Sequence, residues 1–388
     1  MTRALALLAL FALALVGCVN FDREDQVHDM RVLGIRTEPA EILYTPLFLT
    51  PASQRPPGFP LPTVDVDVQV FAFDPRGGNV DTSIQLCPEG QDGSCRLYNP
   101  ADDIAHEPAA ARADVRALVT PQTFTGAVAD ARVQPNEVHW TFSPAIIDFL
   151  IPDSQDGSPI PSIFPLLPRV AVEETNTDAD PTGVVKERAF KRIPVAMDLT
   201  SSDLPPNIAR DLAAGLGITL CAQPIPPEIH DKQGVADCLE ARVPNVNPDL
   251  RGFHFEPDPT KLTEGTATDD VVTPDLGPSS LLRANPGASI VVTPVFAPNT
   301  VERYQVVSFD LNASKIILLN RVEDLACNWY STRGDVSSGL TALQNDPGLG
   351  ISWHTPSNAK SGERDTLILV VLDQRGGTAV GTVAVEYR

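Results

Sequence analysis

The sequence predicts an all-β protein made of tandem antiparallel β-sandwiches with long proline-rich loops and one or two short helices. Prolines number 37 in 388 residues, about twice the usual share of ~5 %, and proline interrupts helix interiors and central strands. Short apolar stretches separated by turn residues recur through the last third of the chain at roughly 8–12-residue spacing, which is typical of a sandwich. A short pattern also occurs twice, which indicates two similar domains.

The first eighteen residues predict export and lipidation. Arg3 precedes an unbroken apolar run at 4–16, which is too short to cross a hydrocarbon layer of ~30 Å as a permanent helix. The run ends in Leu-Val-Gly-Cys, which resembles the lipobox of bacterial lipoprotein signal peptides. That resemblance implies cleavage before Cys18, with diacylglycerol and acyl chains on Cys18 holding the protein to a membrane. Val19, where an aspartate would resemble an inner-membrane retention signal, favours the outer membrane, on its periplasmic or surface face.

The repeated pattern marks the expected first strand of each domain. Gly34-Ile-Arg-Thr-Glu-Pro39 aligns with Gly252-Phe-His-Phe-Glu-Pro257, and an Asp-Met/Leu-Arg triplet precedes both copies. The separator Val-Pro-Asn-Val-Asn-Pro is typical of a connection. We therefore expect a signal peptide at 1–17, a lipidated N-terminus and tether at 18–28, a first domain at 29–242 with a long insertion at about 101–241, and a second domain at 243–388. Ten tether residues reach at most ~35 Å, so we expect the first domain at the membrane and the second projecting outward.

In the first domain, alternation of apolar and polar residues predicts strands. The run at 64–73 alternates for most of its length, which is typical of a strand with one buried face. Asp74-Pro-Arg-Gly-Gly78 supplies the residues of a turn. A helix is expected at 207–217, with Asn207 as its cap and Gly217 as its stop. Further strands are expected at 83–87, 138–142, 167–172 and 189–197, and a helix or a loop at 101–118.

The second domain shows strands and turns more clearly. Strands are expected at 289–296, 304–311, 315–319, 325–331, 351–354, 366–372 and 378–387. Asp373-Gln-Arg-Gly-Gly377 joins the last two and repeats the Asp-x-Arg-Gly-Gly turn of the first domain. Trp329 is expected as the buried aromatic of a central strand.

These residues carry a resemblance to a known fold family. Trp329 followed by Gly334, then Trp353-His-Thr-Pro356, then 367–372 with its Asp-Gln-Arg-Gly-Gly turn, resemble bacterial immunoglobulin-like domains of the PKD and cadherin-like kind. With the lipobox and the first-strand pattern, the chain is similar to predicted surface lipoproteins of gliding and predatory bacteria. The resemblance covers the signal, the first strand and about the last 110 residues, and it implies tandem immunoglobulin-like sandwiches. Such families carry no established catalytic residues, so none is transferred.

Charge and cysteines limit the choice of partners and compartment. Fifty acidic against 29 basic residues give a net charge of −21, and a chain without a basic stripe is not expected to bind nucleic acid. Five cysteines remain beside Cys18 in a compartment that permits disulfides. We expect the local pairs Cys87–Cys95 and Cys221–Cys238, although sequence alone leaves the connectivity open. Cys327 is then a buried free thiol, and no zinc spacing occurs.

Calcium is the one metal that the sequence suggests. Asn176, Asp178 and Asp180 place oxygen ligands at alternate positions, and Glu187 stands twelfth in the count, as in a calcium loop. However, Pro181 occupies the position that needs glycine, so a polar loop between strands explains the same residues. We expect no cofactor beyond the acyl chains on Cys18.

No nucleophile elbow, phosphate loop or His-Glu-x-x-His spacing occurs in the chain. His139 and His354 each stand beside a tryptophan, which a strand explains with Trp inward and His outward. We therefore expect a non-enzymatic, lipid-anchored envelope protein that binds envelope proteins or glycans, or acts as a spacer. The alternatives are an envelope enzyme or enzyme accessory with a site in 101–241, whose sign would be a pocket of converging His, Asp and Glu, and a calcium-stiffened adhesion module.

Overall fold

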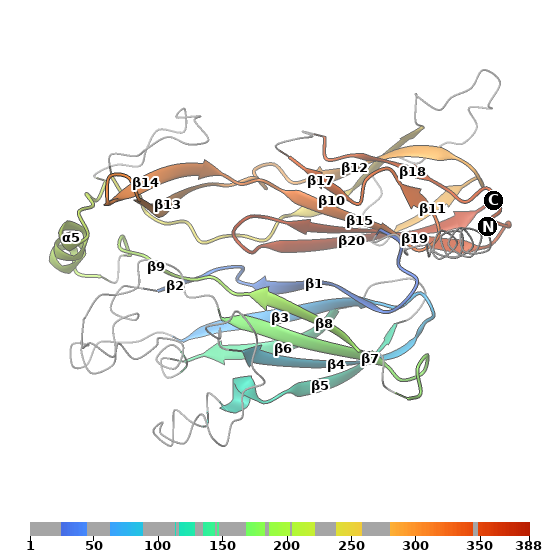
Figure 1. The fold of residues 1–388 in the computed structure, drawn as a ribbon, viewed down its shortest axis with the longest axis horizontal. Helices are drawn as coiled ribbons and strands as arrows, with labels where there is room; N and C mark the ends of the chain where they lie inside the picture. The colour runs from blue at the N-terminus through green and yellow to red at the C-terminus, as the bar shows by residue number, and fades with distance from the viewer. Residues whose placement is uncertain are drawn as a thin grey trace, which may run out of the picture.

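The structure is a computed structural model, and it describes residues 25–44, 63–87, 113, 116–128, 135–143, 146, 168–182, 186–201, 204–221, 238–257, 280–343 and 348–388. Most of these residues lie in β-strands, and the sheets pack in layers (Figure 1). The prediction of an all-β sandwich protein is therefore confirmed. The signal peptide and Cys18 lie outside the described residues.

The first sandwich packs a three-stranded sheet against a four-stranded sheet. One sheet has the order β1 (Arg31–Glu38), β3 (Val64–Phe73), β6 (Pro135–Phe142), and the other has the order β5 (Gln122–Val128), β4 (Gly78–Cys87), β7 (Arg169–Asn176), β8 (Glu187–Arg192). A short parallel pair, β2 (Ile42–Tyr44) and β9 (Val195–Met197), joins them. The core between the sheets contains Val68, Ile84, Trp140 and Val172, all nearly inaccessible to solvent.

We had expected an insertion at about 101–241, and the described strands of that range take part in the first sandwich. They supply β6 to the three-stranded sheet, β5, β7 and β8 to the four-stranded sheet, and β9 to the short pair with β2. After β9 the described chain continues into α5, outside the sandwich. Strand β8 runs through charged residues, and Pro194 separates it from β9, so the expected strand 189–197 is two strands. How the chain divides into domains near 242 stays a prediction.

The second sandwich is larger. One sheet has the order β10 (Leu250–Pro257), β12 (Ser289–Phe296), β18 (Ile351–His354), β16 (Asp335–Val336), and the other has β11 (Ser280–Ala284), β20 (Thr378–Tyr387), β19 (Arg364–Leu372), β15 (Ala326–Ser331), β17 (Leu340–Ala342). Trp329 and Trp353 are fully buried in its core. The sheets are not wholly antiparallel, because β11 pairs with β20 in parallel.

The repeated sequence pattern corresponds to a repeated structural element. The register of β1 against β3 shifts between Val32 and Gly34, and the register of β10 against β12 shifts between Leu250 and Gly252. Each copy is therefore an antiparallel strand with an irregularity just before the aligned glycine. The two stretches are the first strands of the two sandwiches, as the pattern predicts.

The two sandwiches pack against each other, and Figure 1 shows the second above the first along its length. The expected projection of the second sandwich away from a membrane stays a prediction. Leu33 and Phe73 of the first sandwich form a buried cluster with Ile368 and Val370 of β19. A Cβ built on Gly34 would lie 3.4 Å from Val370, so the glycine permits this close approach. Strand β19 is apolar on both faces because one face fills its own core and the other meets the first sandwich.

Residues 25–28 are docked on the second sandwich, although we had expected them to belong to a loose tether. Ser331 donates a backbone hydrogen bond to Asp25, and Val27 donates one to Ser331, both 2.9 Å long. Val27 is fully buried, and the Gln26 side chain donates to Asp335 at 2.9 Å. An apolar residue in the polar stretch, Val27, supplies the burial that fixes the segment.

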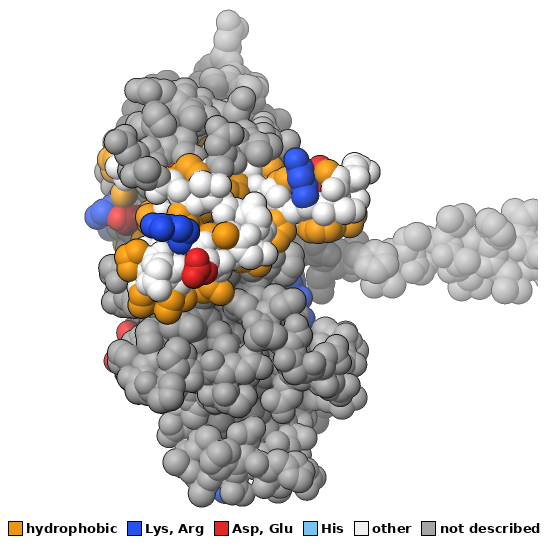
Figure 2. Space-filling view, turned by 90° about the vertical axis from the view of Figure 1, so that its left-hand side faces the viewer, with side chains coloured by type: hydrophobic (Ala, Val, Ile, Leu, Met, Phe, Trp, Pro, Cys, Tyr) orange, Lys and Arg blue, Asp and Glu red, His pale blue; other side chains and the backbone are white. Residues whose placement is uncertain are grey.

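A small end assembly lies outside both sandwiches. It consists of α5 (Pro206–Gly215), the hairpin of β13 (Arg303–Asp310) and β14 (Lys315–Val322), and the disulfide between Cys221 and Cys238. Its own apolar cluster joins residues from the two halves of the chain: Leu199, Leu212, Leu216, Ile218, Leu220, Leu239, Val307, Ile316 and Leu318. Figure 2 looks onto this end of the molecule, where hydrophobic side chains gather with few charges among the described residues.

The helix of this assembly begins differently from our prediction. Pro205 and Pro206 start α5, and Asn207 makes no capping hydrogen bond. Proline at the first helical position fits because its missing N–H would be unpaired there in any case. The stop is as predicted, since Gly217 has φ +70° and Ile218 donates to the carbonyl of Ala213 at 2.8 Å.

Candidate functional site

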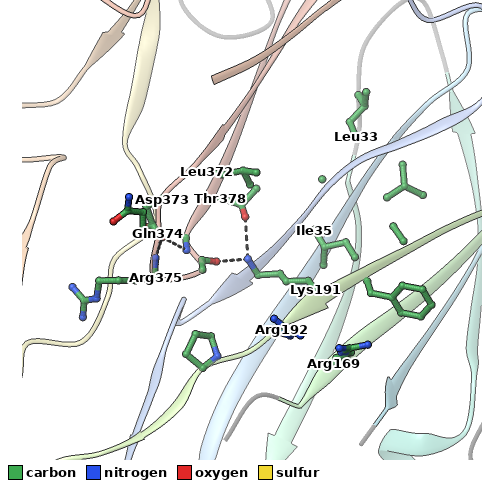
Figure 3. A pocket seen from close by; sticks show the side chains of 17 residues that line it. Leu33, Ile35, Arg169, Lys191, Arg192, Leu372, Asp373, Gln374, Arg375 and Thr378 are labelled. Carbon is green, nitrogen blue, oxygen red and sulfur yellow. Dashed lines mark hydrogen bonds between the residues drawn. The ribbon is translucent and has the colours of Figure 1, made fainter. Parts of the chain in front are cut away.

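A cleft of about 820 Å³ separates the two sandwiches at one side (Figure 3). Its walls are β1 over 32–35, the basic edge strand β8, and the β19–β20 turn over 372–378. Strands β1 and β8 are both the last strands of their sheets among the described residues. The cleft therefore lies between the edge strands β1 and β8 of the first sandwich, and the β19–β20 turn of the second sandwich forms its remaining wall.

Lys191 bridges the two walls of the cleft. Its Nζ donates to the Gly376 carbonyl and, at 2.9 Å, to Thr378 Oγ1 (Figure 3). Burial lowers the pKa of Lys191 to about 8, and the nearby Asp373 carboxylate opposes that shift. The lysine ties the first sandwich to the turn of the second.

Beside Lys191, strand β8 presents a concentration of positive charge in an acidic protein. Lys186, Arg188, Lys191 and Arg192 fall within seven residues, whereas the whole chain has 29 basic residues. Between them Phe190 is 54 % exposed. It borders both the cleft and a second groove of about 540 Å³ on the outer face of the sheet. A half-exposed aromatic flanked by cations is suited to contact an anionic or amphipathic partner.

Above the cleft, a charged joint holds the sandwiches together around Arg375, whose side chain is 7 % exposed. Its Nη2 lies 2.8 Å from Glu41 of the first sandwich. Its Nη1 lies 3.0 Å from Glu302 and 3.4 Å from Glu323. These two residues stand side by side at the open end of the hairpin, just before β13 and just after β14. The guanidinium also lies over the Tyr304 ring, 4.7 Å from its centre.

The connecting segment 242–247 runs through this joint and bonds both sandwiches. Arg242 pairs with Glu41. The Asn247 side chain donates to the Thr37 carbonyl and accepts from the Thr378 N–H, both at 2.8 Å. The predicted connection is therefore a fixed part of the interface and not a flexible linker.

The joint holds more carboxylates than cations. Glu41, Glu302, Glu323 and Asp373 surround Arg375 and Arg242. Burial, together with the negative charges of Asp373 and Glu302, raises the pKa of Glu323 to about 7. Burial also raises the pKa of Glu302, and Arg375 opposes that shift.

The candidate calcium residues are engaged in bonds of their own. Asn176 donates to Asp74 at 2.8 Å and accepts from the N–H groups of Asp178 and Ala179. Asp178 accepts from the Asn79 N–H at 2.8 Å, while Glu187 begins β8 and pairs with Glu174 in the strand register. Among the described residues, no group of three or more His, Cys, Asp or Glu could hold a metal ion. Calcium binding stays a prediction.

The cysteines fall into three environments. Cys221 and Cys238 form a disulfide with Cα atoms 5.0 Å apart. Cys87 is buried at the end of β4 and is disulfide-bonded, but Cys95 lies outside the described residues, so that pairing stays a prediction. Cys327 is a buried free thiol, and burial raises its pKa to about 12.

The histidines beside tryptophans follow the predicted alternation. Trp140 and Trp353 are buried, His139 is exposed and His354 is half-buried. His139 lies 2.7 Å from Asp67 across the strand, on the open face of its sheet. Two further clefts border the described part of 101–241. One lies at α5 and is lined mostly by apolar residues, and the other is lined in part by Glu173, Lys186 and Arg188, where Glu173 pairs with both cations.

The joint and a buried acid in the first sandwich gave no signal in the sequence. Glu174 is fully buried, accepts from Thr82 at 2.8 Å, and leaves its second oxygen without a hydrogen-bond partner. Burial raises the pKa of Glu174 to about 7. Arg375 does occupy the same place as Arg76 in the repeated turn, but Arg76 pairs with its own Asp74, so the motif does not foretell the joint.

Comparisons with known proteins find little. No family model and no curated protein matches the chain. Among solved structures, it is similar to red sea bream transglutaminase, with 9% identity and a TM-score of 0.20 over 85% of this chain and 30% of that one. It is also similar to dimeric latent PorU from Porphyromonas gingivalis, with 10% identity and a TM-score of 0.18 over 94% of this chain and 24% of that one. The chain thus spans less than a third of either neighbour.

One observation concerns membranes. Within the ranges that the structure describes, no helix combines the length and the apolar character that crossing a membrane requires.

Proposed function

We propose that this protein is a non-enzymatic, lipid-anchored protein of the bacterial cell envelope, which uses the cleft and the strand β8 beside it to contact an anionic envelope protein or glycan. Cys18 carries the anchor in this proposal. The finer fold assignment, immunoglobulin-like domains of the PKD or cadherin-like kind, belongs to it as well.

The observation that carries the proposal is the surface of β8. Phe190 is 54 % exposed, Arg188 and Arg192 stand two residues away from it on either side along β8, and Lys186 and Lys191 lie nearby in the sequence of a chain of net charge −21. Charge complementarity of this kind guides an encounter, and an exposed aromatic supplies contact area at low entropic cost. A binding role is favoured over a spacer because the sandwiches lie side by side, an arrangement that adds little length.

Site-specific photocrosslinking on intact cells tests both parts of the proposal. A photoreactive residue placed at Phe190 should give a covalent adduct, whereas the same residue at Phe309, which is 46 % exposed on the end assembly, should not. Cys18→Ala should release the protein from membranes and abolish the adduct. Equal adducts at both positions would reject the β8 surface, and a Cys18→Ala protein that still pellets with membranes would reject the anchor. A hydrolytic activity of the purified protein that one substitution abolishes would favour the enzyme alternative.

A further inference from the structure

The joint around Arg375 contains more carboxylates than cations, as the distances between these groups show. Two carboxylates, Glu302 and Glu323, share the single nitrogen Nη1 of Arg375 at 3.0 and 3.4 Å, while Glu41 occupies Nη2. The Glu302 N–H also donates to Glu323 at 2.9 Å, which fixes the two acids side by side. Two carboxylates that share one buried site do not both ionise readily, because each opposes the charge of the other.

The surroundings do not supply the missing positive charge. From the β19–β20 turn, Asp373 adds a further carboxylate, held by Asn245 at 3.1 Å. Arg242 is the second cation, and it pairs with Glu41. Other charged or titratable groups nearby are Tyr304, Arg321 close to Tyr304, and Asp198, Glu240 and Arg303 around a cavity of about 90 Å³ that Tyr304 and Arg375 also line.

We propose that the joint is a proton-dependent clamp: the Glu302–Glu323 pair retains one proton while the joint is closed, and loss of that proton loosens the hairpin and the β19–β20 turn. The pair titrates as a unit, so the proton is assigned to the pair and not to one oxygen. The raised pKa of Glu323, about 7, places this change near neutral pH.

The β19–β20 turn connects the joint to the cleft. Arg375 points into the joint, whereas the neighbouring Gly376 carbonyl and Thr378 hydroxyl accept from Lys191 in the cleft. A change in the joint therefore moves a wall of the cleft. This regulatory consequence rests on the proposed function, but the clamp itself requires no ligand.

The sign of the pH effect follows from the acid's folded and unfolded pKa values. In the unfolded chain Glu323 ionises near its ordinary value of 4.5, and in the joint near 7. The folded state therefore binds more protons between these values, and stability is lost as pH rises from about 4.5 to 7. Above that range the loss is complete, and below it the contribution is fully present.

Hydrogen exchange of the purified protein at pH 6 and pH 8, corrected for intrinsic exchange rates, tests the clamp. In the wild type, protection of the hairpin and of the β19–β20 turn should fall at pH 8 by on the order of tenfold. Glu323→Gln should remove most of that difference, because its amide is neutral at both pH values. Glu256→Gln, an exposed glutamate on β10, is the matched control and should retain the difference.

A second variant keeps the test decisive if Glu323→Gln fails to fold. Glu302→Gln removes one negative charge from the pair while Glu323 stays buried, so it should reduce the pH difference. The clamp is rejected if the wild type shows no pH difference at the hairpin, or if both glutamine variants retain it. Since exchange is measured without a partner, this result is independent of the photocrosslinking that tests the cleft.

Discussion

At the scale of single residues, Gly334 has almost no room for a side chain. A Cβ there would lie 2.2 Å from Trp353 Nε1 and 2.9 Å from the His354 carbonyl. The Gly334 N–H also donates to the buried Asp365 carboxylate at 2.9 Å. The same carboxylate accepts from Tyr387 at 2.8 Å, so one small residue allows a polar network to close over a tryptophan.

Gly334→Ala should therefore lower the free energy of unfolding by about 2–3 kcal/mol, because Trp353 or the backbone must shift. Urea denaturation followed by tryptophan fluorescence measures this. Gly215→Ala is the matched control: nothing lies within 4 Å of its Cβ position at the end of α5, and removing glycine from a helix should stabilise it by up to about 1 kcal/mol. If Gly334→Ala leaves the free energy of unfolding unchanged, the core is looser than these contacts imply.

At the scale of elements, we expect the stability of the end assembly to depend more on its disulfide than on buried apolar area. Its helix buries only Ala209 and Ala213 fully, and an isolated hairpin is marginally stable in water. The Cys221–Cys238 disulfide closes a segment of sequence separation 17. Loop closure of that length is worth about 3 kcal/mol in the chain-entropy model.

The double variant Cys221→Ser/Cys238→Ser should consequently loosen the end assembly while both sandwiches persist. Hydrogen exchange should rise in α5 and in the β13–β14 hairpin and stay unchanged in β18, which lies in the second sandwich core. Equal loss of protection in β18 would mean that the assembly and the sandwich unfold together, contrary to this expectation.

At the scale of the whole molecule, Arg375 decides whether the sandwiches act as one body. Arg375→Ala would leave Glu41, Glu302 and Glu323 buried without their shared cation, a loss worth about 3–5 kcal/mol. We expect calorimetry to change from one transition to two, as the sandwiches uncouple. Arg76→Ala is the matched control from the repeated turn, since Arg76 forms ion pairs with Asp74 and Asp29. This variant should lower the temperature of one transition without separating the two sandwiches. A single transition in both variants would contradict the coupling role.

Much of the second sandwich could be predicted from the sequence. The strands 289–296, 351–354 and 378–387 have the predicted bounds, because period-two alternation and turn residues are local properties. The repeat led correctly to β1 and β10 for the same reason. The first sandwich was harder, since β7 and β8 carry charges and Pro194 interrupts the run that follows.

The sequence by itself determined the all-β class, the two first strands, the buried tryptophans and the local Cys221–Cys238 closure, because each depends on neighbours along the chain. Only the tertiary structure decided the face-to-face packing, the docked segment 25–28, the cleft beside β8 and the joint around Arg375. These depend on contacts such as Arg375 with Glu41, 334 residues apart. The same Asp-x-Arg-Gly-Gly pattern forms a self-contained turn in one sandwich and an interface in the other, because what surrounds the arginine is set by packing and not by the motif.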